Sequence, residues 1–188
     1  MRNINWHGNN ALIVGRFQPM HKGHLEVIKA ISAKSDKIIV GIGSAQHSHI
    51  PDNPFTAGER YIMISDTLRD EGINNAYIVP IEDTNRYSIW VSHVECMCPP
   101  FSVVYSNNKY TRLLFMEAGY EVRKLPMFNR EEYSGIEVRR RMFEGGNWED
   151  LIPKQVVSVI KGIGGVNRIK ALMNDSPDKL ENKMCPYE

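Results

Sequence analysis

Short apolar runs alternate with helix-like segments over the first two thirds of the chain. Ala11 to Gly15 is an apolar run closed by glycine, and Lys22 to Lys34 follows with apolar residues at helical spacing. This pair predicts a strand, a turn and a helix.

The same unit recurs along the chain. Thr56 is the expected N-cap of the second helix, and Glu59 three residues later completes a capping box. Because the connections between strands are too long for hairpins, the alternation predicts a doubly wound α/β fold, a parallel sheet covered on both faces. Further strands are predicted at 37–43, 77–81, 101–105 and 120–125, and further helices at 56–69, 88–98 and 109–117.

Past Pro126 the strand pattern stops and short helices separated by glycine-rich breaks are predicted at 134–143, 153–161 and 166–173. The chain is therefore predicted to form one α/β domain over residues 1–173, with a helical part at about 134–173. The polar, proline-containing stretch 174–188 is expected to be a mobile tail.

Composition narrows the class of protein. The 188 residues contain 23 Lys+Arg and 22 Asp+Glu, a net charge of +1, which argues against a nucleic-acid partner. Cys96, Cys98 and Cys185 have no metal-site spacing, and no stretch is apolar enough for a signal peptide or a membrane span. A cytoplasmic protein with no membrane partner is expected.

Two histidines, His21 and His24, stand in the first strand-to-helix turn, where an open parallel sheet often binds phosphate. The turn has neither the dinucleotide fingerprint nor the P-loop pattern. On a helix, a spacing of three places both imidazoles on one face at the positive end, with Gly23 between them leaving room for a ligand.

Four interpretations of the histidine pair are open: structural histidines, a metal pair, a helix cap and a phosphate site. A metal pair lacks a third ligand nearby, and a helix cap does not account for the adjoining Arg16. In the phosphate interpretation, a polyphosphate is faced by Arg16, His21, Lys22 and His24.

A second anion site is predicted near residue 134. Ser134 is a good N-cap for the helix that follows, whose amides and dipole attract an anion. Arg139, Arg140 and Arg141 point about 100° apart around a helix, so they cannot all face one ligand. Arg140 and Arg141 are expected at the surface, over the core or at a subunit contact.

Two motifs carry a family resemblance. GRFQPMHKGH at 15–24 resembles the (H/T)xGH signature of the nucleotidyltransferase superfamily, in which the histidine pair contacts ATP phosphates. YSGIEVR at 133–139 is similar to the ISxTxxR signature of that superfamily, and selects Arg139 for the phosphates. Tyr133 and Ile136 depart from this pattern. Ile136 stands where the motif has threonine, so Ser134 and backbone amides must replace the missing hydroxyl.

Further segments narrow the resemblance. GSAQHSH at 43–49, NPFTAGER at 53–60 and YSGIEVRRRM at 133–142 resemble the archaeal type of nicotinamide-nucleotide adenylyltransferase over about residues 11–173. This implies attack of a mononucleotide phosphate on the α-phosphorus of ATP, giving NAD and pyrophosphate. The nucleophile is already an anion, so catalysis is positioning and charge neutralisation, with Mg²⁺ bound mainly through ATP phosphates.

The resemblance, together with positions that follow the carboxyl ends of the predicted strands, suggests roles for individual residues. The expected catalytic residues are Arg16, His21, His24 and Arg139. ATP or its phosphates are expected to contact Gly15, Phe17, Lys22, Gly23, Ser106, Asn107, Ser134 and Gly135. The nicotinamide nucleotide is expected to contact Gly43, Ser44, Gln46, Asn53, Tyr87 and Trp90.

Some alternatives stay open. Trp90 is equally compatible with stacking on a nicotinamide ring and with buried packing, whereas Phe55 is expected to pack. Another superfamily member acting on phosphopantetheine or a different small phosphorylated substrate is the second hypothesis, and a non-catalytic nucleotide-binding module is the third. The resemblance also implies a homo-oligomer, such as a hexamer.

Overall fold

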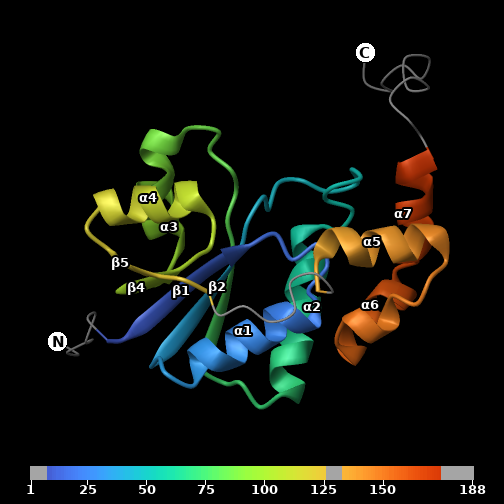
Figure 1. Ribbon diagram of the computed structural model, residues 1–188, viewed down its shortest axis with the longest axis horizontal. Coiled ribbons are helices and arrows are strands. Elements are labelled where there is room, and N and C mark those ends of the chain that lie inside the picture. The colour runs from blue at the N-terminus through green and yellow to red at the C-terminus, as the bar shows by residue number, and fades with distance from the viewer. Residues whose placement is uncertain (1–7, 126–132, 175–188) are drawn as a thin grey trace.

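A five-stranded, all-parallel sheet forms the centre of the computed structural model, which describes residues 8–125 and 133–174 (Figure 1). The order β3-β2-β1-β4-β5 confirms the predicted doubly wound α/β fold, because the direction of winding reverses between β1 and β4. Ligands of such sheets bind at this reversal, beyond the carboxyl ends of the strands. The strands are β1 (Asn10–Gly15), β2 (Lys37–Ile42), β3 (Ala76–Pro80), β4 (Val103–Tyr105) and β5 (Glu121–Arg123).

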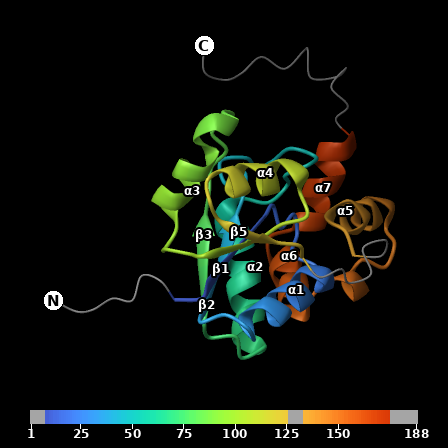
Figure 2. The ribbon, with the colours of Figure 1, turned by 60° about the vertical axis from the view of Figure 1, so that its left-hand side comes forward.

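Helices cover both faces of the sheet (Figure 2). Alternate residues of a strand point to opposite faces, so Leu12 joins a core with Val94 and Phe115, whereas Ile13 joins the larger core with Ile28. The first core packs under α3 (Trp90–Met97, preceded by the 3₁₀ turn η1, Tyr87–Ile89) and α4 (Lys109–Glu117). The second packs under α1 (Lys22–Ser32) and α2 (Ala57–Asp70).

The C-terminal helices extend the larger core. Val156, Ile160 and Ile169 are at most 1% exposed and belong to the same apolar cluster as the strands. In Figure 1 these helices stand together at one end of the molecule. They are α5 (Gly135–Glu144), the 3₁₀ turn η2 (Glu149–Leu151), α6 (Lys154–Gly162) and α7 (Gly165–Asn174). All but the first residue of the predicted tail 174–188 lies outside the described residues.

Local signals set several helix ends. The predicted capping box is present at α2, where Glu59 N–H donates to Thr56 Oγ1 at 3.1 Å and Thr56 N–H donates to Glu59 Oε2 at 2.9 Å. Gly119, with φ +88°, follows α4, and Gly145, with φ +79°, follows α5. Glycine adopts these left-handed conformations at little cost, which explains why the helices end there.

The third predicted helix differs from its expected bounds. Residues 88–98 were predicted as one helix, but the α-helix covers only Trp90–Met97 and a 3₁₀ turn precedes it. None of the helices that the structure describes has the length and apolar character needed to span a membrane.

Candidate active site

A cavity of about 330 Å³ lies beyond the carboxyl ends of β1 and β4, where the sheet order reverses. All four predicted catalytic residues line it: Arg16, His21, His24 and Arg139. Five of the predicted ATP or phosphate residues also do so, namely Phe17, Gly23, Asn107, Ser134 and Gly135. The structure therefore brings together two segments that are separated by more than 100 residues in sequence.

His21 and His24 form a reciprocal capping box at the start of α1. The main-chain N–H of His24 donates to Nδ1 of His21, and that of His21 donates to Nδ1 of His24, each at 3.3 Å. His21 is thus the N-cap rather than a residue inside the helix. The rings stack with centroids 3.6 Å apart, so both imidazoles still share one face, as predicted.

The capping bonds fix the proton positions of both rings. A neutral imidazole has one N–H, and a ring whose Nδ1 accepts a bond carries its proton on Nε2. Burial lowers the pKa of His21 from 6.5 to about 4, and burial together with the neighbouring His21 lowers the pKa of His24. Both side chains are therefore neutral donors through Nε2–H.

The free energy of unfolding is expected to fall as the pH is lowered from 6.5 towards 4. In this window unfolded His21 takes up a proton that the folded state excludes, which costs about 1.4 kcal/mol per pH unit. Urea unfolding at a series of pH values measures the slope. His21→Asn keeps a side-chain acceptor that cannot be protonated, so its slope should be shallower; equal slopes would contradict the neutral assignment.

Three contacts hold the loop that precedes the histidines. Phe17 has a left-handed backbone, with φ 49°, which is unusual for a non-glycine residue and needs support from its surroundings. Gln18 supplies part of it, since its side-chain amide donates to Phe55 O at 2.9 Å and accepts from Phe55 N–H at 3.0 Å. Arg139 Nη1 donates to Gln18 O at 2.8 Å, and Arg60 Nη1 donates to Arg16 O at 2.9 Å.

Arg139 connects α5 to that loop. It is only 6% exposed, and its Nη2 lies 3.3 Å from Asp52 Oδ1, on the loop after β2. Gly135 makes the approach possible, because a Cβ there would lie 3.1 Å from Gln18 O and 3.2 Å from Arg139 Nη1. Ser134 caps α5 as predicted, its Oγ accepting from Glu137 N–H at 3.1 Å.

The neighbouring arginines do not line this cavity. Arg140 pairs with Glu137 and Glu144, and Arg141 pairs with Glu137 at 2.8 Å. These contacts keep both side chains on the outer surface of α5, in agreement with the helical geometry. Ile136, which stands where the motif has threonine, is 68% exposed at the cavity wall.

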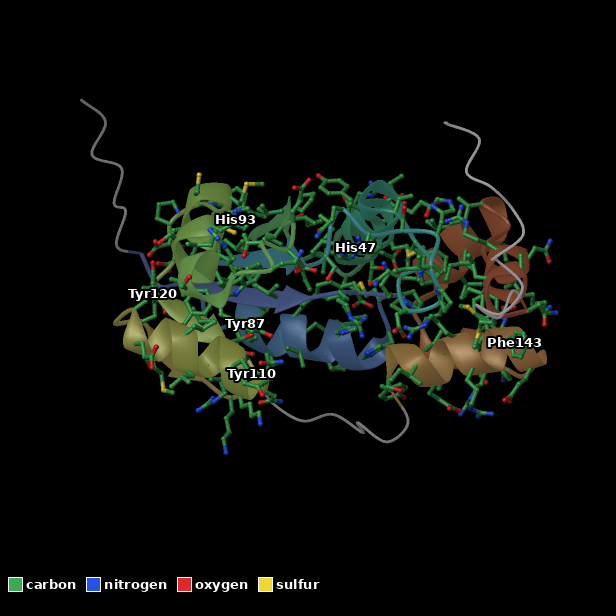
Figure 3. All side chains as sticks on the ribbon, turned by 90° about the horizontal axis from the view of Figure 1, so that it is seen from above. His47, Tyr87, His93, Tyr110, Tyr120 and Phe143 are labelled. Atoms are coloured by element: carbon green, nitrogen blue, oxygen red, sulfur yellow. The ribbon has the colours of Figure 1, made fainter. Side chains whose placement is uncertain are left out.

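A second cavity of about 440 Å³ lies between the loop after β3 and the start of α4. Tyr87 and Trp90 line it, and Tyr110 from α4 faces Tyr87 with ring centroids 6.0 Å apart (Figure 3). Gln46 braces its wall from outside: its amide accepts from Asp83 N–H at 3.0 Å and donates to Asp83 O at 3.4 Å. Trp90 is half-buried, because it lines this cavity and also packs against the core of Leu12, Val94 and Phe115.

Seven predicted binding residues do not line either cavity: Gly15, Lys22, Ser106, Gly43, Ser44, Gln46 and Asn53. Lys22 lines a separate groove between α1 and α6. Ser106 is buried, with Oγ accepting from Asn108 N–H at 3.1 Å, and so shapes the entry to α4. Asn53 is buried beside Asp52.

The motif reasoning missed four residues of this region: Gln18, Asp52, Arg60 and Tyr110. Gln18 and Arg60 act on main-chain atoms of distant loops, and no spacing in the sequence marks such contacts. Asp52 and Tyr110 are exposed residues that reach the site only through the fold. Gln18 and Arg60 do lie inside the sequence motifs at 15–24 and 53–60, which is the only mark that the sequence gives them.

The sheet is doubly wound, and one cavity at its reversal is lined by a histidine pair, by the start of α5 and by Arg139 of the same helix. This combination defines a nucleotidyltransferase-type protein. The cytidylyltransferase-like family model matches residues 12–141. The chain belongs to this family and, within it, to the nicotinamide-nucleotide adenylyltransferases. Proteins with that name from Thermoplasma volcanium and Thermoplasma acidophilum are 54% and 55% identical over 170 and 168 residues. These alignments span 90% and 89% of this chain and 96% and 94% of the relatives.

Solved structures agree on the fold. A bifunctional NMN adenylyltransferase/ADP ribose pyrophosphatase from Francisella tularensis, crystallised with AMP and a manganese ion, superimposes with a TM-score of 0.70 at 23% identity. The match covers 89% of this chain but 53% of that one, so this chain spans about half of the bifunctional protein. A putative nicotinate-nucleotide adenylyltransferase from Vibrio parahaemolyticus gives a TM-score of 0.59 at 18% identity, over 85% and 94% of the two chains.

Proposed function

We infer that this chain transfers the AMP moiety of ATP to nicotinamide mononucleotide, forming NAD and pyrophosphate. Relatives named for this reaction share more than half of its residues over about nine tenths of its length. The observation that carries the inference is the convergence of His21, His24 and Arg139 on one cavity at the reversal of the sheet.

The site suits a reaction between two anions. The mononucleotide phosphate is negatively charged at neutral pH, so it needs no general base, and the barrier lies in positioning and charge. His21 and His24 offer neutral Nε2–H donors, and Arg16 and Arg139 offer fixed positive charge. The phosphates of ATP are assigned to this cavity, with the main-chain amides at the start of α5 as further donors.

Mg²⁺ is the proposed metal, carried into the site by ATP. Across residues 8–125 and 133–174, no group of three or more His, Cys, Asp or Glu side chains could hold a metal ion. The first cavity is lined by nitrogen donors that suit phosphate oxygens, those of Arg16, His21, His24 and Arg139. Phosphates and water would therefore supply the oxygen ligands that Mg²⁺ prefers. When bound, the ion neutralises phosphate charge.

Pyrophosphate release tests the reaction directly. The purified protein should release pyrophosphate from ATP when nicotinamide mononucleotide is added, and NAD should form in equal amount. Phosphopantetheine or glycerol phosphate in its place should give background rates. A preference for one of these would favour a different superfamily transferase, and ATP binding without release for any acceptor would favour a non-catalytic module.

The second cavity is assigned to the nicotinamide nucleotide. Its aromatic side chains, Tyr87, Trp90 and Tyr110, offer flat surfaces to a pyridine ring, and Asn108 and Thr111 at the same wall offer polar groups. Gln46 contributes by bracing Asp83. Gly43, Ser44 and Asn53, in the loop after β2, are also assigned to the nicotinamide nucleotide in this proposal.

Trp90→Ala is expected to raise the KM for nicotinamide mononucleotide about tenfold, the loss typical for one aromatic stacking partner. The KM for ATP should stay within about twofold, because Trp90 does not line the first cavity. Steady-state kinetics with each substrate varied in turn measures both values. Trp90→Phe keeps a ring face and should recover most of the affinity; a parallel rise in both KM values would instead indicate a packing role.

A homo-oligomer and a cytoplasmic location complete the proposal. Two exposed aromatic residues, Tyr61 and Tyr77, line one groove beside the edge strand β3, which favours contact with another copy. Cys96 and Cys98 are free thiols, as expected for a reducing compartment. Light scattering of the purified protein gives the subunit number, and a monomer mass would contradict the first part.

A further inference from the structure

Arg60, on the first turn of α2, has a fully buried side chain and lies outside the lining of both cavities. Its guanidinium donates four hydrogen bonds, all to main-chain carbonyl oxygens. Nε donates to Thr56 O at 3.2 Å, Nη1 to Arg16 O at 2.9 Å and to Gly43 O at 2.8 Å, and Nη2 to Ser44 O at 3.1 Å. A buried cation is costly unless its donors are satisfied, and these four carbonyls supply the acceptors that keep Arg60 inside the fold.

The acceptors of Arg60 belong to two segments that are separate in sequence. Arg16 precedes Phe17 in the loop after β1, whereas Gly43 and Ser44 begin the loop after β2. One guanidinium thus connects the carboxyl ends of two neighbouring strands, where the phosphate cavity and the loop of the predicted mononucleotide residues meet.

Both segments contain a left-handed residue. Phe17 and Ser44 each have φ 49°, a conformation that non-glycine residues rarely adopt and that needs support from the surroundings. Arg60 donates to the carbonyl just before Phe17 and to that of Ser44 itself. Burial, and then the charge of Arg16, lowers the pKa of Arg60 to about 10, so the side chain stays charged at neutral pH.

We propose that Arg60 is a positioning residue, which sets the distance between the two substrates by fixing the main chain after β1 and β2 without contacting either substrate. The expected effect on kinetics rests on the proposed function. The effect on the structure of the two loops rests on the hydrogen bonds of Arg60. Lysine has the same charge but lacks the planar fork that reaches four separate carbonyls at once.

Arg60→Lys is expected to lower kcat about 100-fold, the loss typical when reacting groups are displaced by about 1 Å. Each KM should change less than kcat, since neither substrate loses a direct contact. Arg168→Lys is the matched control. Arg168 also donates to a main-chain carbonyl, Pro54 O at 3.1 Å, and pairs with Glu59 next to Arg60. It therefore holds α7 to α2 and to the end of the loop after β2, whereas the carbonyls of Arg16, Gly43 and Ser44 are bonded by Arg60.

Kinetics and thermal unfolding of both variants decide the matter. A folded Arg60→Lys with low kcat, beside Arg168→Lys with nearly unchanged kcat, supports the proposal. A folded Arg60→Lys with kcat within about threefold of the original protein overturns it, as does an equal loss in both variants. If the original protein itself makes no NAD, the proposed function fails and not the role of Arg60.

NMR of the unmodified protein provides a second test that does not depend on activity or on the variant's folding. The Nε–H of Arg60 should exchange slowly with solvent, as a buried group bonded to Thr56 O does. Its chemical shift should respond little to ATP, whereas that of Arg139 should move. Rapid exchange, or an Arg60 shift as large as that of Arg139, would overturn the proposal.

Discussion

His24→Ala is expected to lower kcat at least ~100-fold, the usual loss for one charge-stabilising donor, which corresponds to about 2.7 kcal/mol of transition-state stabilisation. The Nε2–H of His24 faces the phosphate cavity because its Nδ1 accepts the main-chain N–H of His21. The same substitution also removes half of the capping box of α1, worth about 1 kcal/mol of folding stability.

Two matched variants separate these effects. His24→Asn places an oxygen near the position of Nδ1, so it should keep the cap and the unfolding midpoint but lose the donor and the activity. His24→Gln places an N–H₂ near the position of Nε2, so it should keep more activity at a lower stability. Stopped-assay kinetics and thermal unfolding measure the two properties. Full activity in His24→Asn would assign His24 to folding alone.

The fold could be predicted from sequence because its signals are local. The strands and helices follow the apolar periodicity, and the Thr56–Glu59 capping box is a contact between residues three apart. The family resemblance assigns the motifs at 15–24 and 133–139 to the same ATP phosphates, so they were also expected to meet. The cavity lined by His21, His24 and Arg139 confirms that they do.

The supporting contacts of the site could not be predicted, because their acceptors are main-chain atoms. Arg60 and Gln18 recognise carbonyl oxygens of loops whose shape exists only in the folded chain. A carbonyl oxygen has no sequence identity, so no residue spacing marks these bonds. Tyr110 illustrates the same limit for surfaces, since only the packing of α4 beside α3 brings its ring to Tyr87.

The position of Lys22 along α1 decides which surface its side chain faces. Next to two histidines of the cavity, it was expected to contact phosphates. His21 precedes α1 as its N-cap, however, and Lys22 is the first helical residue, so its side chain lies over the groove towards α6. A one-residue step turns a helical side chain by about 100°, which is enough to change the surface that it faces.

Arg139→Ala is expected to lower kcat/KM at least ~100-fold through loss of a positive charge beside the phosphates. It also leaves Gln18 O without its donor at 2.8 Å and Asp52 without its partner, so the loop that carries the histidines loses one of its supports. Arg139→Lys keeps the charge but not the fork. Its kcat/KM should therefore lie between those of the original protein and the alanine variant.

Arg140→Ala is the matched control, since Arg140 is the next residue of the same helix and pairs with Glu137 and Glu144 at the surface. Exposed pairs of this kind contribute little to stability, so its kinetics should match those of the original protein. Initial rates with ATP varied at saturating mononucleotide measure the contrast. The Arg139 guanidinium is buried at the cavity, whereas that of Arg140 is at the surface. Equal losses in the two alanine variants would therefore mean that α5 supports the site only through its folding.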